Sequence, residues 1–263
     1  MTREKLVIGA IAGDIIGSIY EWHNIKTVEF DLFCQRSTFT DDSVLTLATM
    51  DAILNQKNFT KVYHEFGRRY RAGYGHSFSN WIRSETPKPY NSWGNGSAMR
   101  VSPVGWFCNS LEEVFDKAKE SAEVTHNHPE GIKGAQATAA AVYMARTGNN
   151  KDDIKKFIMD TFHYNLDRKI DDIRPHYKFD VSCQGSVPEA IIAFLESTDF
   201  EHSIRLAVSI GGDSDTIACI AGGIAEAYYK EIPEYIIENV IRILPNEMLS
   251  ILEDFSMKYG KER

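Results

Sequence analysis

Residues 211–227 read GGDSDTIACIAGGIAEA, an acidic turn followed directly by small and apolar residues. A run of Ala, Gly, Ile and Cys with so little charge predicts a helix that is buried on all sides. A second stretch, predicted to be helical over about residues 3–20, carries Gly9, Gly13 and Gly17 on one face. Each glycine costs about 1 kcal/mol of helix stability, so something must approach this face closely. Whether the partner is the 211–227 helix is left open by the sequence.

Helical periodicity continues through the rest of the chain. Apolar residues recur every three or four positions, as Leu47, Met50 and Leu54 do, and few stretches alternate as strands would. Signals for helix starts are frequent, and they include Thr40, Pro129, Pro233 and the capping box Ser186-x-x-Glu189. We therefore predict an all-α chain that forms one domain over residues 1–263, with its main loop region at about residues 70–97.

The composition is that of an ordinary globular protein. Of the 263 residues 43% are hydrophobic, and 37 acidic against 29 basic residues give a net charge of −8. This charge argues against sequence-independent binding to a nucleic-acid backbone. No run of residues approaches the ~20 apolar positions of a membrane span, and we predict a monomeric cytoplasmic protein. The cysteines lack the spacing of a zinc site or a disulfide framework, so we predict reduced, buried thiols at Cys34, Cys108, Cys183 and Cys219.

Two short acidic clusters open predicted helices near opposite ends of the chain. Thr40-Asp41-Asp42-Ser43 and Asp213-Ser214-Asp215-Thr216 each offer two carboxylates with neighbouring hydroxyls. Such oxygen ligands suit hard divalent cations, for example Mg²⁺ or Mn²⁺. The same residue types are also common helix caps, and acids in a first turn are stabilised by the helix dipole. Each cluster holds more acids than capping requires, and both interpretations remain open at this point.

Glu21 is a further candidate for chemistry. It follows Asp14 by seven residues, which is about two helical turns, so the two carboxylates share a face of the first predicted helix. This spacing places Glu21 at the end of that helix, where it could reach a substrate or could be a solvated charge.

Two glycine-containing segments could approach a phosphate. The loop 90–100, YNSWGNGSAMR, combines flexible backbone with amides and hydroxyls, and its Trp93 could stack on a flat base; Gly73-Tyr74-Gly75 is a second such segment. Neither is a Walker loop, because no Gly-Lys-Ser/Thr follows, and ordinary turns remain the alternative. His126 and His128 have no third ligand at matching spacing, which disfavours zinc, and we interpret His126 as a hydrogen-bonding loop residue.

Taken in order, these segments resemble the ADP-ribosylglycohydrolases. The matching motifs span about residues 7–230 and are GDIIGSIYE (13–21), TDDS (40–43), GYG (73–75), GNGSAMR (94–100), TH (125–126), SVPEA (186–190) and GGDSDT (211–216). The resemblance implies a compact orthogonal helical bundle with two divalent cations, Mg²⁺ or Mn²⁺, in a cleft. The metal ligands that it implies are Thr40, Asp41, Asp42, Asp213, Asp215 and Thr216.

The resemblance also implies roles for the remaining candidates. Glu21 matches an acidic residue that takes part in acid–base chemistry at the anomeric carbon, while the metals engage hydroxyls of the distal ribose. Gly73 and Gly75 would lie near the diphosphate. The other substrate-binding residues, around the phosphate, the adenosine and the cleft, would be Ser92, Trp93, Asn95, Gly96, Met99 and His126. We therefore expect a hydrolase that releases ADP-ribose from a protein, small-molecule or nucleic-acid acceptor.

Two other functions stay open. One is a catalytically silent relative that binds ADP-ribose or has a structural role, and the other is a hydrolase of a different ribosyl or nucleotide metabolite. The acceptor is not determined by any of these motifs, because all acceptors share the same ADP-ribose. Loops at the rim should select it, and residues 76–92 and 164–185 are the expected segments.

Overall fold

The computed structural model of the chain describes residues 7–260. These residues form helices joined by loops, and their only extended pairing is an isolated bridge between Gly94 and Ser182. The helices are α1 (Gly9–Gly17), α2 (Asp41–Leu54), α3 (Phe59–Arg69), α4 (His76–Arg83), α5 (Gly96–Met99), α6 (Ser102–Phe107), α7 (Leu111–Glu123), α8 (Pro129–Arg146), α9 (Lys151–Phe162), α10 (Ile170–Ile173), α11 (Cys183–Glu196), α12 (Phe200–Ile210), α13 (Ser214–Tyr229), α14 (Glu234–Ile243) and α15 (Asn246–Tyr259). The prediction of an all-α chain is confirmed.

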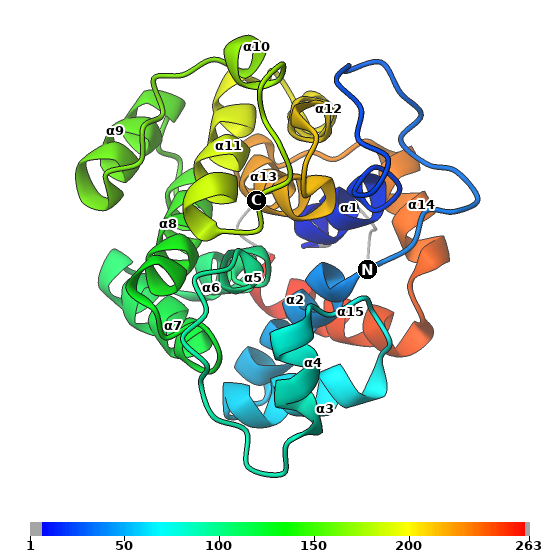
Figure 1. Cartoon of the computed structure of the whole chain (residues 1–263), viewed down its shortest axis with the longest axis vertical. Coiled ribbons are helices and arrows are strands. Elements are labelled where there is room, and N and C mark those ends of the chain that lie inside the picture. Colours follow the sequence, from blue (N-terminus) through cyan, green and yellow to red (C-terminus); the bar gives the residue numbers. More distant parts are fainter. Residues whose placement is uncertain (1–6, 261–263) are drawn as a thin grey trace.

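Helix α13 lies at the centre of the molecule, and α1 packs along it (Figure 1). The glycine face of α1 forms this contact, because a Cβ atom at Gly17 would lie 2.5 Å from the Cα of Asp215 and one at Gly13 would overlap the carbonyl of Ala218. The two backbones therefore touch directly. The question that the sequence left open is answered: the two small-residue helices are partners, and their contact sets the end of α1 against the start of α13.

The buried carboxylate of Glu226 on α13 secures the start of α1. It accepts hydrogen bonds from the backbone N–H groups of Ile8 (3.0 Å) and Gly9 (2.8 Å). The first N–H groups of a helix have no partner within the helix, and a negative charge there also interacts favourably with the helix dipole. Glu226 thus fixes both the position and the direction of α1 on α13.

We expect Gly13→Ala to destabilise the fold strongly. A methyl group at this position has no space against the Ala218 carbonyl, and overpacking typically costs about 1–3 kcal/mol, which exceeds the gain of about 1 kcal/mol in helix propensity. Denaturant unfolding followed by circular dichroism measures the loss. Gly75→Ala is the control, because a Cβ there meets nothing within 4 Å and the φ angle of −57° suits any residue. Equal stability of the two variants would contradict the packing argument.

Several predicted boundaries are wrong. Helix α1 ends at Gly17, so Glu21 lies in a long loop between α1 and α2 rather than at a helix end; residues 3–6 of the predicted helix lie outside the described range. The expected loop region 70–97 contains α4, whose Phe78 and Trp81 side chains are buried. Phe78 and Trp81 are three residues apart, so they share one face of the helix. Their burial favours helix formation despite the glycines and prolines around this segment.

The predicted capping box at Ser186 and Glu189 is also wrong. Helix α11 begins at Cys183, and its cap is Ser182, whose hydroxyl accepts from the N–H of Gly185 at 3.1 Å. Ser186 and Glu189 are therefore buried inside the helix.

The cysteine prediction is correct for three thiols only, because Cys34 is exposed on the α1–α2 loop. Among residues 7–260, no helix combines the length and the apolar character needed to cross a membrane. The expected cytoplasmic location and the single-domain organisation stay predictions.

Candidate metal centre and ligand cleft

The two acidic clusters meet where α2 and α13 begin. Thr40 caps α2 and accepts from the N–H of Asp42 at 3.3 Å. Asp213 occupies the capping position of α13, but its side chain makes no capping hydrogen bond and is available for another contact. A hydrogen bond of 3.3 Å from the Thr216 hydroxyl to the Asp42 carboxylate joins the two helix starts. Residues 174 positions apart in the sequence thus form one site.

Carboxylate oxygens are crowded at this junction. One oxygen each of Asp14, Asp42 and Asp215 lie within 4.8 Å of one another, and so do oxygens of Glu21, Asp213 and Asp215. Asp215 belongs to both groups. Two sets of three acids that share one member have the chemistry of a site for two hard cations.

The buried acids lack partners that would balance their charge. The Oδ1 atoms of Asp42 and Asp215 are buried and have no hydrogen-bond partner. Burial, followed by the neighbouring carboxylates, raises the pKa of both groups well above the usual range. Burial and the charge of Asp14 likewise raise the pKa of Asp41 to about 8. A bound divalent cation would satisfy the orphaned oxygens and stabilise the ionised carboxylates, so the residues present fit a metal centre.

Asp14 has a structural role that the sequence did not predict. It is fully buried on α1, and its carboxylate accepts from the N–H (2.9 Å) and hydroxyl (2.7 Å) of Thr40, from the N–H of Ser43 (3.0 Å) and from the Ser43 hydroxyl. Asp14 therefore attaches the start of α2 to α1. The sequence did offer a signal for this role: Asp14 is an acid within a helix of small apolar residues, and a buried charge needs hydrogen-bond partners.

Glu21 lies against the Asp213 side of the cluster. Its side chain is half-buried, and burial raises its pKa to about 7, with a further increase from Asp213 and an opposing hydrogen bond from the Trp22 side chain. A carboxyl group with this pKa can hold or release a proton near neutral pH, as general acid–base catalysis requires.

One cavity of about 410 Å³ includes these acids and most of the predicted ligand-binding residues. The predicted residues that line it are Glu21, Asp41, Asp42, Gly73, Gly75, Ser92, Asn95, Gly96, Met99, His126, Asp213, Asp215 and Thr216. Thr40 and Trp93 are not among the lining residues. The hydroxyl of Thr40 is instead engaged with Asp14 and Asp42.

Asn95 and His126 are held in place by the protein around the cavity. The Asn95 amide donates to the carboxylate of Asp213 (2.6 Å) and to the Ser186 hydroxyl (3.0 Å). The Nδ1 atom of His126 is 2.7 Å from the Thr125 hydroxyl, which agrees with its predicted role as a hydrogen-bonding loop residue. Burial lowers the pKa of His126 well below its usual value, so its imidazole is neutral.

The aromatic residues at the cavity differ from the expected one. Trp93 is 54% exposed and lies edge-on to His128, with 5.6 Å between the ring centroids. Trp22 and Phe179 line the cavity instead, stacked on each other with centroids 5.3 Å apart, and Tyr90 lines it as well. The position of Trp22 directly after Glu21 was the signal that the sequence offered. Phe179 lies within the segment 164–185 that was expected at the rim.

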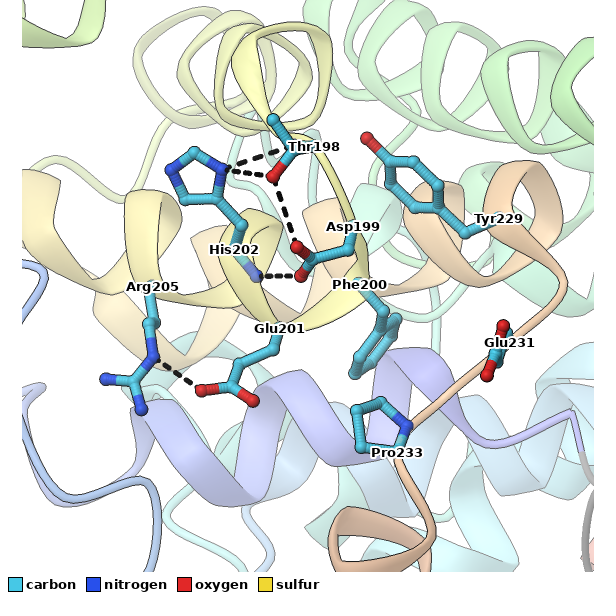
Figure 2. A pocket seen from close by; sticks show the side chains of 9 residues that line it. All are labelled: Thr198, Asp199, Phe200, Glu201, His202, Arg205, Tyr229, Glu231 and Pro233. Carbon is cyan, nitrogen blue, oxygen red and sulfur yellow. Dashed lines mark hydrogen bonds and ion pairs between the residues drawn. The ribbon is translucent and has the colours of Figure 1, made fainter.

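A second hollow of about 680 Å³ lies at the start of α12, and none of the residues of the two acidic clusters line it (Figure 2). Its polar side chains bind one another: Asp199 accepts from the N–H of His202 at 2.8 Å, and the His202 ring contacts the Thr198 hydroxyl at 3.0 Å. Arg205 and Glu201 form an ion pair of 2.7 Å. These contacts cap and brace α12, so we assign no ligand to this hollow.

Comparisons with known proteins agree on one family. A family model described as ADP-ribosylglycohydrolase matches residues 4–262. ADP-ribosylhydrolase ARH3 from Mus musculus is 26% identical, and the match covers 86% of this chain and 84% of the relative. A putative ADP-ribosyl glycohydrolase, L543, from Acanthamoeba polyphaga mimivirus is 26% identical, and the match covers 94% of this chain and 93% of the relative. A solved ADP-ribosylglycohydrolase-related protein complex has the same fold, with a TM-score of 0.71, 22% identity and coverage of 97% and 96%.

Proposed function

The chain belongs to the ADP-ribosylglycohydrolase family, and from this membership we propose that it is a metal-dependent hydrolase that cleaves the glycosidic bond between ADP-ribose and a modified acceptor. The observation that carries the proposal is the arrangement of the cleft: two acidic helix starts with orphaned carboxylate oxygens lie beside Glu21 in one cavity. The relatives named above as ADP-ribosylhydrolases support the substrate class.

The metal-holding residues in this proposal are Thr40, Asp41, Asp42, Asp213, Asp215 and Thr216. When bound, two divalent cations, Mg²⁺ or Mn²⁺, supply Lewis-acid stabilisation and a water of lowered pKa. The chain itself aligns these groups: Asp14 fixes the start of α2, and Asn95 orients the carboxylate of Asp213. Their geometry is thus set by hydrogen bonds within the protein.

Glu21 moves the proton in this proposal. Cleavage of a glycosidic bond needs a proton on the leaving group and a deprotonated water at the anomeric carbon, and a carboxyl with a pKa of about 7 can serve either need. The stacked rings of Trp22 and Phe179 line the same cavity as this carboxylate. We place the acceptor on their side of the cleft.

The rest of the cavity suits ADP-ribose. A Cβ at Gly73 or Gly75 would meet nothing within 4 Å, so a diphosphate can approach the backbone there without steric conflict. A Cβ at Gly96 would lie 3.2 Å from Nε2 of His126, so this glycine allows the loop to pack against the neutral imidazole. In this proposal the adenosine lies toward Ser92 and Tyr90, which line the same cavity.

Of the two alternatives, one differs from this proposal in what it requires of Glu21 and the other differs in its substrate. A catalytically silent relative that binds ADP-ribose does not require the raised pKa of Glu21 or its position beside the acidic cluster. A hydrolase of another ribosyl metabolite would use the same groups, and substrate assays separate the two.

Release of ADP-ribose from a panel of acceptors tests the proposal. The protein with Mg²⁺ is incubated with arginine-linked, serine-linked, acetyl-ester, polymeric and nucleic-acid-linked ADP-ribose, and free ADP-ribose is quantified. We expect turnover of at least one member, its loss with a chelator and its return with added Mg²⁺ or Mn²⁺. Tight ADP-ribose binding with no release from any member would instead favour the silent relative.

A further inference from the structure

Asn24 connects two segments of the chain that are distant in sequence. Its side-chain amide donates toward the carbonyls of Tyr20 (2.8 Å), Glu21 (2.7 Å) and Gly212 (3.0 Å). Its side-chain oxygen accepts from the N–H of Gly212 at 2.8 Å. One side chain on the α1–α2 loop thus uses both ends of its amide to bind the turn that precedes α13.

The turn that Asn24 binds leads directly into Asp213. Gly211 and Gly212 have φ angles of +74° and +75°, a region that other residues adopt at a cost. A Cβ at Gly212 would also lie 2.5 Å from the ring of Tyr177. The turn is therefore specific in shape, and Lys26 braces it further by donating from Nζ to the carbonyls of Ile210 and Tyr177.

Glu21 has no regular secondary structure to hold it. It lies four residues beyond the end of α1, and its carboxylate reaches those of Asp213 and Asp215, within 4.8 Å. The carbonyl of Glu21 itself is bound to Asn24. The distance between Glu21 and Asp213 thus depends on the Asn24 side chain, which binds the backbone of one and the backbone neighbour of the other.

We infer that Asn24 is a positioning residue that fixes the distance between Glu21 and the Asp213 half of the acidic cluster. The inference rests on the proposed hydrolase function, because this distance matters for proton transfer to or from a substrate at the cleft. A misplacement of about 1 Å can cost about a hundredfold in rate, whereas binding of ADP-ribose through the remaining cleft residues tolerates it.

The test compares Asn24→Ala with wild type. We expect kcat for ADP-ribose release to fall about 10- to 100-fold, with the Kd for free ADP-ribose in Mg²⁺ unchanged within about threefold. Asn239→Ala is the matched control: Asn239 likewise donates to the carbonyl four residues earlier (Tyr235, 2.7 Å), but it does not line the cleft. It should keep the wild-type kcat.

A purely structural role predicts a different result. In that case kcat, ADP-ribose affinity and melting temperature of Asn24→Ala would fall together, and the inference would be overturned, as it would be by an unchanged kcat. Should Asn24→Ala not fold, Asn24→Gln decides, because its amide is one methylene too long to bind Gly212 and the loop carbonyls together. A wild-type kcat in Asn24→Gln would overturn the inference, and a reduced kcat with intact ADP-ribose binding would support it.

Failure of the proposed function gives a separate signature. If wild type releases no ADP-ribose from any acceptor, that function is refuted, and crystal structures of wild type and Asn24→Ala test the positioning by itself. A Glu21 carboxylate that moves away from Asp213 in the variant supports the inference. An unmoved carboxylate overturns it.

Discussion

Glu21→Gln should bind ADP-ribose normally and lose most of its turnover. The amide is isosteric with the carboxyl group but cannot take or give the proton, and general acid–base catalysis contributes about 10²- to 10⁴-fold. The burial that raises the pKa of Glu21 to about 7 gives this carboxyl group a proton to exchange near neutral pH. We expect kcat to fall by about this factor, while the calorimetric Kd for ADP-ribose in Mg²⁺ changes by less than about threefold.

A matched control lies in the same loop. Glu29 is exposed and does not line the cavity, so Glu29→Gln removes one negative charge from the loop without touching the cleft. It should retain wild-type kcat. Turnover by Glu21→Gln equal to that of Glu29→Gln would remove Glu21 from the mechanism and move the acid–base role to another group of the cluster.

Asp215→Asn should abolish the response of the protein to metal. For wild type stripped of metal, Mg²⁺ or Mn²⁺ at about 100 times its Kd stabilises the native state by about 3 kcal/mol, which is about 5–10 °C in melting temperature for a chain of this size. Asp215 contributes an oxygen to both groups of clustered acids, so its replacement removes a ligand from each. We expect no metal-induced shift in the variant and no ADP-ribose release.

The same variant should be more stable than wild type when metal is absent. Burial and the carboxylates of Asp42 and Asp213 raise the pKa of Asp215 well above its usual range, so its ionised form costs stability at neutral pH, and a neutral amide avoids this cost. Differential scanning calorimetry with and without Mg²⁺ measures both effects. Asp171→Asn is the control, since Asp171 is 88% exposed in an ion pair with Arg174. A wild-type metal shift in Asp215→Asn would refute the proposed ligand set.

Local patterns were enough to predict the helical class of the chain and the acidic groups. Helical periodicity predicted an all-α chain because a helix repeats its buried face every three to four residues wherever it packs. Thr40 and Pro129 correctly indicated the starts of two helices, because capping depends on a few adjacent residues. The Ser186 prediction failed because Ser182, four residues earlier, offers the same chemistry, and only the packing of Gly185 and its neighbours selects between the two.

The cleft was only partly predictable. Gly96 and His126 line the cavity as expected, because each belongs to a short motif with its own chemistry. Trp93 does not, although it lies in the same motif, because the orientation of an exposed ring depends on neighbours such as His128. Phe179 could not be placed from sequence, since its stacking on Trp22 joins two loops that no local pattern relates.

The amino-acid sequence by itself determined which residues could hold cations, which helices they begin and which family the motifs resemble, because these depend on residue type and short spacing. The resemblance implied that the two acidic clusters form one metal centre, and only the tertiary structure decided how they meet. That meeting follows from close backbone packing along the glycine face of α1, where a Cβ at Gly17 would lie 2.5 Å from the Cα of Asp215, and from the hydrogen bonds of Asp14 to Thr40 and Ser43. Contacts between distant segments depend on complementary shape across the whole fold, which no stretch of sequence records alone.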